Sequence, residues 1–271
     1  PLCYSPPAMN YTLQEWLNLL IRWVHVFAAI LWIGQTWLFM WLDARLHDPK
    51  EGGAVWMVHS GGFYVVEKQT RPELKRTLHW FRWEAAITWI TGALLLVVVY
   101  YLGGLLTDAD SPLSLHASIA ASVALLVAGW FAYDALWISP LGKNGYVGGF
   151  LSFLMLMALA YGSIILFSSR AAWLQVGAVM GTAMAANVWV RILPAQRRLI
   201  AAAMEDREPE QWLADRAKGR SKHNSFMVVP VVLIMLSSHF PIATYGNRHS
   251  LIVLGGIILA GWAAASVLRT R

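Results

Sequence analysis

The sequence predicts an all-α membrane protein, a polytopic bundle of about seven transmembrane helices. Of its 271 residues, 58% are hydrophobic and only 13% are charged, whereas a soluble domain is about half apolar and about a quarter charged. The mean hydropathy is +0.51. The apolar residues gather in runs long enough to cross a bilayer, which takes about 20 helical residues. Composition and run length together exclude an ordinary soluble fold.

Charge and cysteine content narrow the functional classes. The formal net charge of +6 resides in segments that flank apolar runs, so we interpret it as a topology signal rather than as nucleic-acid binding. The single Cys3 excludes an internal disulfide. The chain has no C-x-x-C-H motif, so a covalently attached c-type haem is not expected. Fifteen tryptophans suit the aromatic belts at membrane interfaces.

The first predicted span covers Leu13–Leu42, after an N-terminal extension of residues 1–12 in which Met9 opens a natural start. The segment 51–68 is too short and too glycine-rich to cross the membrane as a helix. We therefore expect it to be an interfacial or partly re-entrant piece. A basic stretch, Lys68 to Arg82, leads into the second span.

The remaining spans follow from apolar runs and their boundaries, and residues 13–271 form one transmembrane domain. They are expected at His79–Leu106, His116–Ile138, Val147–Phe167, Ala172–Ile192, Asn224–Phe240 and Ser250–Leu268. The fifth is expected to stop or kink just before Pro194. Residues 195–222 carry charges of both signs and predict a cytoplasmic amphipathic helix pair broken near Pro209.

The loop charges predict the orientation. Lys and Arg concentrate after the first, third, fifth and seventh spans, and cytoplasmic loops carry this excess. The N-terminus is therefore expected outside and the C-terminus in the cytoplasm.

His25 lies well inside the apolar run Ile21–Leu42. An ionisable residue at membrane depth needs a partner, a cavity or a metal. A neutral imidazole is a common protein ligand of haem iron. The sequence leaves two interpretations open, a haem ligand or a histidine hydrogen-bonded to a neighbouring helix.

A second histidine shares the predicted depth of His25. With a rise of about 1.5 Å per residue, His25 lies roughly 14 Å below Trp16, and His239 lies roughly 22 Å above Asn224. Both positions fall in the outer half of a core about 30 Å thick. We therefore predict His25 and His239 as the two metal ligands of one b-type haem.

Further polar residues lie on the inner side. His59, His79 and His223 gather there, as do Asp134, Asn187 and Arg191 inside the third and fifth spans. Acids and bases within a membrane often pair with one another, and a proton route or a pocket for an anionic substrate is the alternative. Two histidine groups at two depths are what a transmembrane electron path through b-type haem requires, although interfacial histidines give the same pattern.

Several ordered motifs are shared with one family. They read HVFAAILWIG, AVWMVHSGGFYVVEK, TLHWFRWEAAITWITG, FAYDALWISPLG, GTAMAANVW with ILPAQRR, and RSKHNSFMVVPVVLIMLSSHFP. From Met9 to the last span the chain resembles the membrane domain of the bacterial membrane-bound urate oxidase (urate hydroxylase), which is typically fused to a C-terminal cytochrome c domain. That domain does not follow here, and Ser225 and Ser238 stand where the family pattern has asparagine.

The resemblance implies oxidation of urate to 5-hydroxyisourate in the bacterial inner membrane, with electrons passed to cytochrome c or to a cytochrome c domain on another chain. The expected cofactor is haem b, the expected surroundings are the lipid bilayer and a larger membrane complex, and no nucleic acid is expected. The alternative is a non-catalytic subunit, haem-bearing or structural, of an electron-transfer complex.

The inner cluster, which comprises His59, His79 and His223, has two expected roles. His79 and His223 open the second and sixth spans and are candidate ligands of a second haem. The same region offers hydrogen-bonding groups for a flat anion such as urate, and a substrate pocket is the other option. The candidate substrate-binding residues are His59, Arg82, Glu84 and Asn224.

Overall fold

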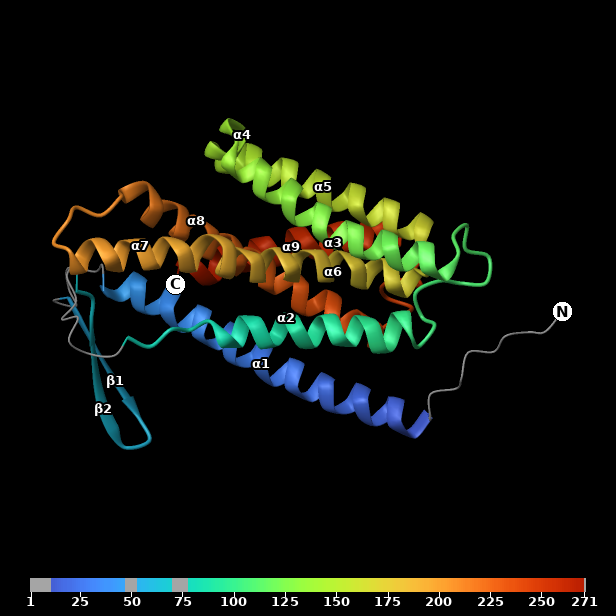
Figure 1. Ribbon diagram of the computed structural model, residues 1–271, viewed down its shortest axis with the longest axis horizontal. Coiled ribbons are helices and arrows are strands. Elements are labelled where there is room, and N and C mark those ends of the chain that lie inside the picture. The colour runs from blue at the N-terminus through green and yellow to red at the C-terminus, as the bar shows by residue number, and fades with distance from the viewer. Residues whose placement is uncertain (1–10, 47–52, 70–77, 271) are drawn as a thin grey trace.

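The computed structural model describes residues 11–46, 53–69 and 78–270. Its long helices run side by side along the longest axis (Figure 1). In chain order the helical elements are α1 (Tyr11–Leu46), α2 (Trp83–Leu95), the π-helix η2 (Leu96–Tyr101), α3 (Leu115–Ile138), α4 (Pro140–Lys143), α5 (Gly145–Leu166), α6 (Ser169–Ala186), the π-helix η3 (Asn187–Ile192), α7 (Leu193–Met204), α8 (Gln211–Leu236), the 3-10 turn η4 (Ser237–His239) and α9 (Ser250–Thr270). The predicted helical membrane bundle is confirmed.

Six helices of the described segments are long and apolar enough to cross a membrane. They are α1, α2 continued by η2, α3, α5, α6 continued into α7, and α9. The helix α8 is not among them, because its first half carries many charges. It nevertheless runs along the bundle and packs against α6 and α9 (Figure 1). A crossing by the apolar half of α8, predicted as the sixth span, therefore remains a prediction.

The helix α6 lies at the centre of the bundle, in contact with α3, α5 and α8. Trp173, Val176 and Met180 of α6 are almost fully buried. Small residues allow such close packing: a Cβ added at Gly177 would lie 2.9 Å from Cγ2 of Ile234 on α8. By contrast, only 6% of the apolar window of α1 is buried, so the rest of the chain leaves most of this apolar surface uncovered.

The helix of the predicted fifth span does not stop before Pro194, which was one of the two outcomes expected from the sequence, the other being a kink. The helix passes through the π-helix η3 and continues as α7, with Pro194 in the first turn of α7. Because the helix is continuous here, Pro194 leaves one upstream carbonyl without its helical N–H donor. The wider π turn that precedes it offers a physical reason for the continuation.

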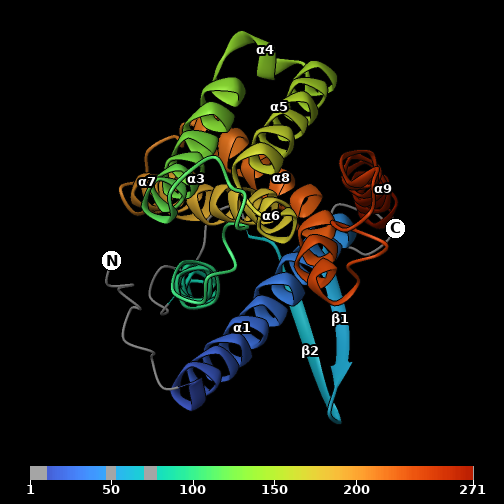
Figure 2. The ribbon, with the colours of Figure 1, turned by 90° about the vertical axis from the view of Figure 1, so that its right-hand side faces the viewer.

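Residues 51–68, expected to be an interfacial or partly re-entrant piece, contain a β-hairpin. The strands β1 (Ala54–His59) and β2 (Gly62–Glu67) pair in antiparallel register. Ser60 and Gly61 between them have φ angles of 49° and 77°, the left-handed pair that a two-residue hairpin turn requires. Alternating β-branched and aromatic residues favour strands over a helix here. The hairpin points sideways from one end of the bundle (Figures 1 and 2).

The arrangement yields a topology prediction. Because α1 begins at the end of the bundle opposite to that where α9 ends (Figure 1), an odd number of crossings is expected, with the C-terminus in the cytoplasm. Alkaline phosphatase fused after Arg271 should be inactive, and green fluorescent protein fused there should fluoresce. Phosphatase fused after Asp110, in the loop between η2 and α3, is the control and should be active. An active phosphatase after Arg271 would contradict this topology.

Candidate functional site

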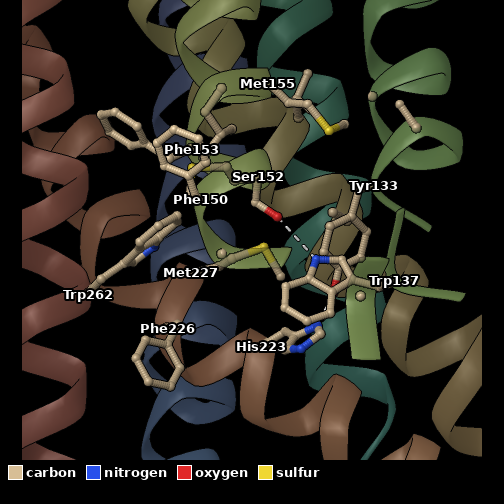
Figure 3. A pocket seen from close by; sticks show the side chains of 18 of the residues that line it. Tyr133, Trp137, Phe150, Ser152, Phe153, Met155, His223, Phe226, Met227 and Trp262 are labelled. Carbon is tan, nitrogen blue, oxygen red and sulfur yellow. Dashed lines mark hydrogen bonds between the residues drawn. The ribbon is translucent and has the colours of Figure 1, made fainter. Parts of the chain in front are cut away.

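A cavity of about 1210 Å³ lies between α3, α5, α6, α8 and α9. It exceeds the roughly 300–1,000 Å³ that small-molecule sites usually have. Its wall is mainly apolar, and Figure 3 shows the aromatic and methionine side chains in it, which include Phe150, Phe153, Met155, Phe226, Met227 and Trp262. Two cations, Lys143 and Lys222, also line it, and no acidic residue does so in the described part of the chain. The cavity therefore suits a flat, largely apolar or anionic ligand.

His223 and two aromatic residues of α3 form a polar corner of this cavity. The His223 Nδ1 atom lies 2.8 Å from the Tyr133 hydroxyl. The His223 ring centroid is 4.0 Å from that of Trp137, whose Nε1–H donates to Ser152 over 3.1 Å (Figure 3). The imidazole is thus held between two rings, and the corner offers both stacking and hydrogen bonding to a ligand.

His223 precedes the predicted sixth span, and its surroundings keep it neutral. Burial, with the positive charges of Arg220 and Lys222, lowers the pKa of His223 to about 3. An anion bound beside it would reverse part of this shift, since a nearby negative charge favours the protonated imidazole.

A layer of amides supports Tyr133 from behind. The Asn187 Nδ2 group donates to the Tyr133 hydroxyl over 3.0 Å and to Asn224 Oδ1 over 2.9 Å. Asn224 in turn donates to the Met184 carbonyl over 3.1 Å. Asn187 and Asn224 are both buried. Asn224, a candidate substrate-binding residue, thus holds the amide layer that positions Tyr133.

An ion cluster joins three elements next to this layer. Asp134 Oδ1 accepts from Arg191 Nε over 3.0 Å and from Arg220 Nη2 over 2.8 Å. Arg191 also pairs with the second carboxylate oxygen. The Arg220 guanidinium lies 5.0 Å from the centroid of the Tyr133 ring. The structure thus shows Asp134 paired with basic residues. This pairing was one of the two alternatives left open by the sequence, the other being a proton route or a pocket for an anionic substrate.

His25 packs against α2 on the other side of the bundle. Its Nδ1 lies 2.9 Å from the Thr88 carbonyl and 3.1 Å from the Thr91 hydroxyl. A carbonyl only accepts, so Nδ1 carries the hydrogen and Nε2 is left with a free lone pair. A Cβ added at Gly92 would lie 3.1 Å from the His25 ring, so glycine makes room for the imidazole. Such an oriented imidazole fits a haem ligand.

The other candidate residues have separate surroundings. His239 is exposed in η4, and no contact joins it to His25 among the described residues. His79 is exposed, and the centroid of its ring lies 4.6 Å from that of the Phe81 ring in a T-shaped arrangement. His59 is exposed at the end of β1. None of these contacts joins His59 or His79 to His223, so the proposed inner cluster and shared haem remain predictions.

The two charged candidates at the start of α2, the N-cap residue Arg82 and Glu84 in the first turn, also have local partners. The Arg82 guanidinium lies 5.7 Å from the centroid of the Trp83 ring. Glu84 accepts from the Gln35 Nε2 group over 3.2 Å, which ties the start of α2 to α1. Both residues are half-buried.

Three residues that shape the site were not predicted: Tyr133, Trp137 and Arg220. Arg220 lies three positions before His223, and this spacing places both on one helix face. Tyr133 and Trp137 are four positions apart and share a face of α3 in the same way. These spacings were available in the sequence, but nothing marked the two faces as neighbours.

Removing the charge at the centre of the ion cluster should destabilise the bundle. In an Asp134→Asn variant, Arg220, whose side chain is 3% exposed, would lose its counter-charge. Breaking such a buried pair costs about 3–5 kcal/mol. The apparent melting temperature of the purified protein in detergent should fall clearly. Arg198→Gln, which removes the exposed ion pair with Glu210, is the control and should cost about 1 kcal/mol or less. Equal melting temperatures for the two variants would refute the structural role.

No curated protein and no solved structure matches the chain. The family model described as urate oxidase N-terminal matches residues 11–271, which is nearly the whole chain. The chain belongs to the urate oxidase N-terminal family.

Proposed function

We propose that this protein is a membrane-bound oxidoreductase of the bacterial inner membrane that oxidises urate to 5-hydroxyisourate and delivers the electrons to cytochrome c. Family membership supports the choice of substrate. The observation that carries the proposal is the corner formed by Tyr133, Trp137 and His223 in a cavity lined by lysines but not by acids.

The chemistry of urate matches this corner. Urate is a flat anion with N–H donors and carbonyl acceptors, so it can stack on an aromatic ring and exchange hydrogen bonds with an imidazole and a phenol. Trp137 supplies the ring, and His223 and Tyr133 supply the hydrogen-bonding groups. Lys143 and Lys222 provide the positive charge that an anion needs in an apolar setting.

The reaction balances with water and two one-electron acceptors. Urate gains the oxygen of one water molecule and becomes 5-hydroxyisourate, while two protons and two electrons leave. Each ferric cytochrome c takes up one electron. The proposed acceptor is cytochrome c, or a cytochrome c domain on another chain, within a larger membrane complex.

Haem b is the proposed prosthetic group, and when bound it would relay electrons one at a time. His25 is the best-oriented ligand, because Thr88 and Thr91 fix its ring and leave Nε2 available. His239 is its proposed partner. His79 and His223 are the proposed ligands of a second haem if the cavity does not hold the substrate.

Urate turnover tests the proposal directly. Purified protein should reduce added cytochrome c in a urate-dependent manner, and Tyr133→Phe should lower kcat/KM about 10- to 100-fold, because a hydrogen bond to a charged group contributes about 1.5–3 kcal/mol. Tyr161→Phe is the matched control, because Tyr161 is exposed on α5 away from the cavity. Loss of activity in both variants would remove the special role of Tyr133. A protein that binds haem but shows no turnover would be the non-catalytic subunit.

Haem content provides a second, independent measurement. His25→Ala should abolish the reduced-minus-oxidised α band of a bis-histidine haem b, and Gly92→Ala should shift it because a methyl group would push on the His25 ring. His249→Ala is the control, because His249 is exposed and bonded to its neighbour Arg248. An unchanged spectrum in His25→Ala would exclude His25 as a ligand.

The same measurement separates the two roles of the inner histidines. In His79→Ala or His223→Ala, a lower haem-to-protein ratio would identify a haem ligand. Full haem content with reduced urate turnover would identify a substrate contact. Full haem content with full turnover would leave only interfacial histidines.

A further inference from the structure

One face of the β-hairpin is apolar and has no partner in the described part of the chain. Side chains alternate between the two faces of a hairpin, and the cross-strand pairs Trp56–Val65 and Val58–Phe63 share one face. These four side chains are exposed by 72%, 45%, 69% and 80%. Water is an unfavourable neighbour for such a contiguous patch, which marks an interaction surface.

The opposite face explains how the hairpin is held. Val55 on that face is only 4% exposed, and β1 contacts α1. The hairpin is therefore attached to α1 at the buried end of this face, whereas Tyr64 farther along the same face is 51% exposed. Each strand has six residues, so the hairpin extends roughly 20 Å.

The position of the hairpin indicates what lies next to it. It is attached near the end of α1 and points sideways, across the long axis of the bundle (Figures 1 and 2). The apolar surface of α1 is left uncovered by the rest of the chain over most of its predicted span, and the bilayer is the apolar surrounding that suits it. The apolar face thus continues the lipid-facing surface at the level where α1 leaves the apolar core.

Basic residues on either side of the hairpin also fit a position at the membrane–water boundary. Arg45 in the last turn of α1 is exposed, and Lys68 follows β2, half-exposed and paired with Asp43. Tryptophan and basic residues together are typical of the membrane–water boundary. A water-exposed loop would not require Trp56 or Phe63.

We propose that the hairpin of residues 54–67 is a lipid-binding element that inserts Trp56, Val58, Phe63 and Val65 into the headgroup–acyl boundary of the inner leaflet. It anchors the inner end of α1 in the plane of the membrane, as interfacial amphipathic segments do. This proposal is independent of urate chemistry and of haem.

The single native thiol makes a direct test practical. In a Cys3→Ser background, Val58→Cys and Glu208→Cys are each labelled with the fluorophore NBD and reconstituted into vesicles of phosphatidylcholine and phosphatidylglycerol. Glu208 is the control, because it is exposed in the break between α7 and α8. The Val58 label should emit at shorter wavelength than the Glu208 label and be quenched by nitroxide-bearing lipids. The Glu208 label should remain unquenched.

Two further variants distinguish the causes of a negative result. A label at Val65→Cys, which lies on the same face but on the other strand, should behave like the Val58 label. This agreement would show that the result does not come from a local disturbance of one strand. Replacing Trp56 and Phe63 by serine should reverse the shift of the Val58 label. Hairpin labels as water-exposed as the Glu208 label would overturn the proposal. Disulfide-linked dimers through Val58→Cys would also overturn it, because a second copy would then cover the face.

Discussion

Polar groups inside the bundle must find their partners within the chain, because the surrounding lipid supplies none. The most demanding case is Asp134, whose carboxylate is shared by Arg191 and Arg220. These residues come from α3, η3 and α8, so one carboxylate fixes the mutual positions of three elements. Arg220 also lies against the Tyr133 ring. The ion cluster thereby determines where the polar corner of the cavity forms.

The two π-helical segments, η2 and η3, also supply partners for polar groups inside the bundle. In η3, the Asn187 side chain donates a hydrogen bond to the Tyr133 hydroxyl, and the Arg191 side chain binds Asp134. In η2, the Tyr101 hydroxyl lies 2.8 Å from the Ser122 hydroxyl, which donates to Gln175 over 2.8 Å. π-helical turns frequently occur at functional sites. Here each brings a side chain of one span into a polar network with another.

The two histidine environments differ in a way that bears on function. His25 has its Nδ1 engaged by α2 and its Nε2 free, which suits a ligand role. His223 has its Nδ1 against a phenol and its ring on an indole, inside a large cavity. Ser225, where the resemblance implied asparagine, accepts from Arg269 over 3.0 Å and so connects α8 to α9. The substitution has a structural role outside the cavity.

The sequence by itself determined the helical membrane class, the approximate places of the long apolar helices and the family resemblance, because hydropathy and motifs are properties of consecutive residues. It also marked Asp134 and Arg191 as groups that need partners. Only the tertiary structure decided that Tyr133 and His223, ninety positions apart, share one hydrogen bond, and that Pro194 does not end its helix. It also decided that residues 54–67 form a hairpin. These features depend on which helix faces meet and on which backbone bonds replace water, and neither is encoded in the local pattern of a single segment.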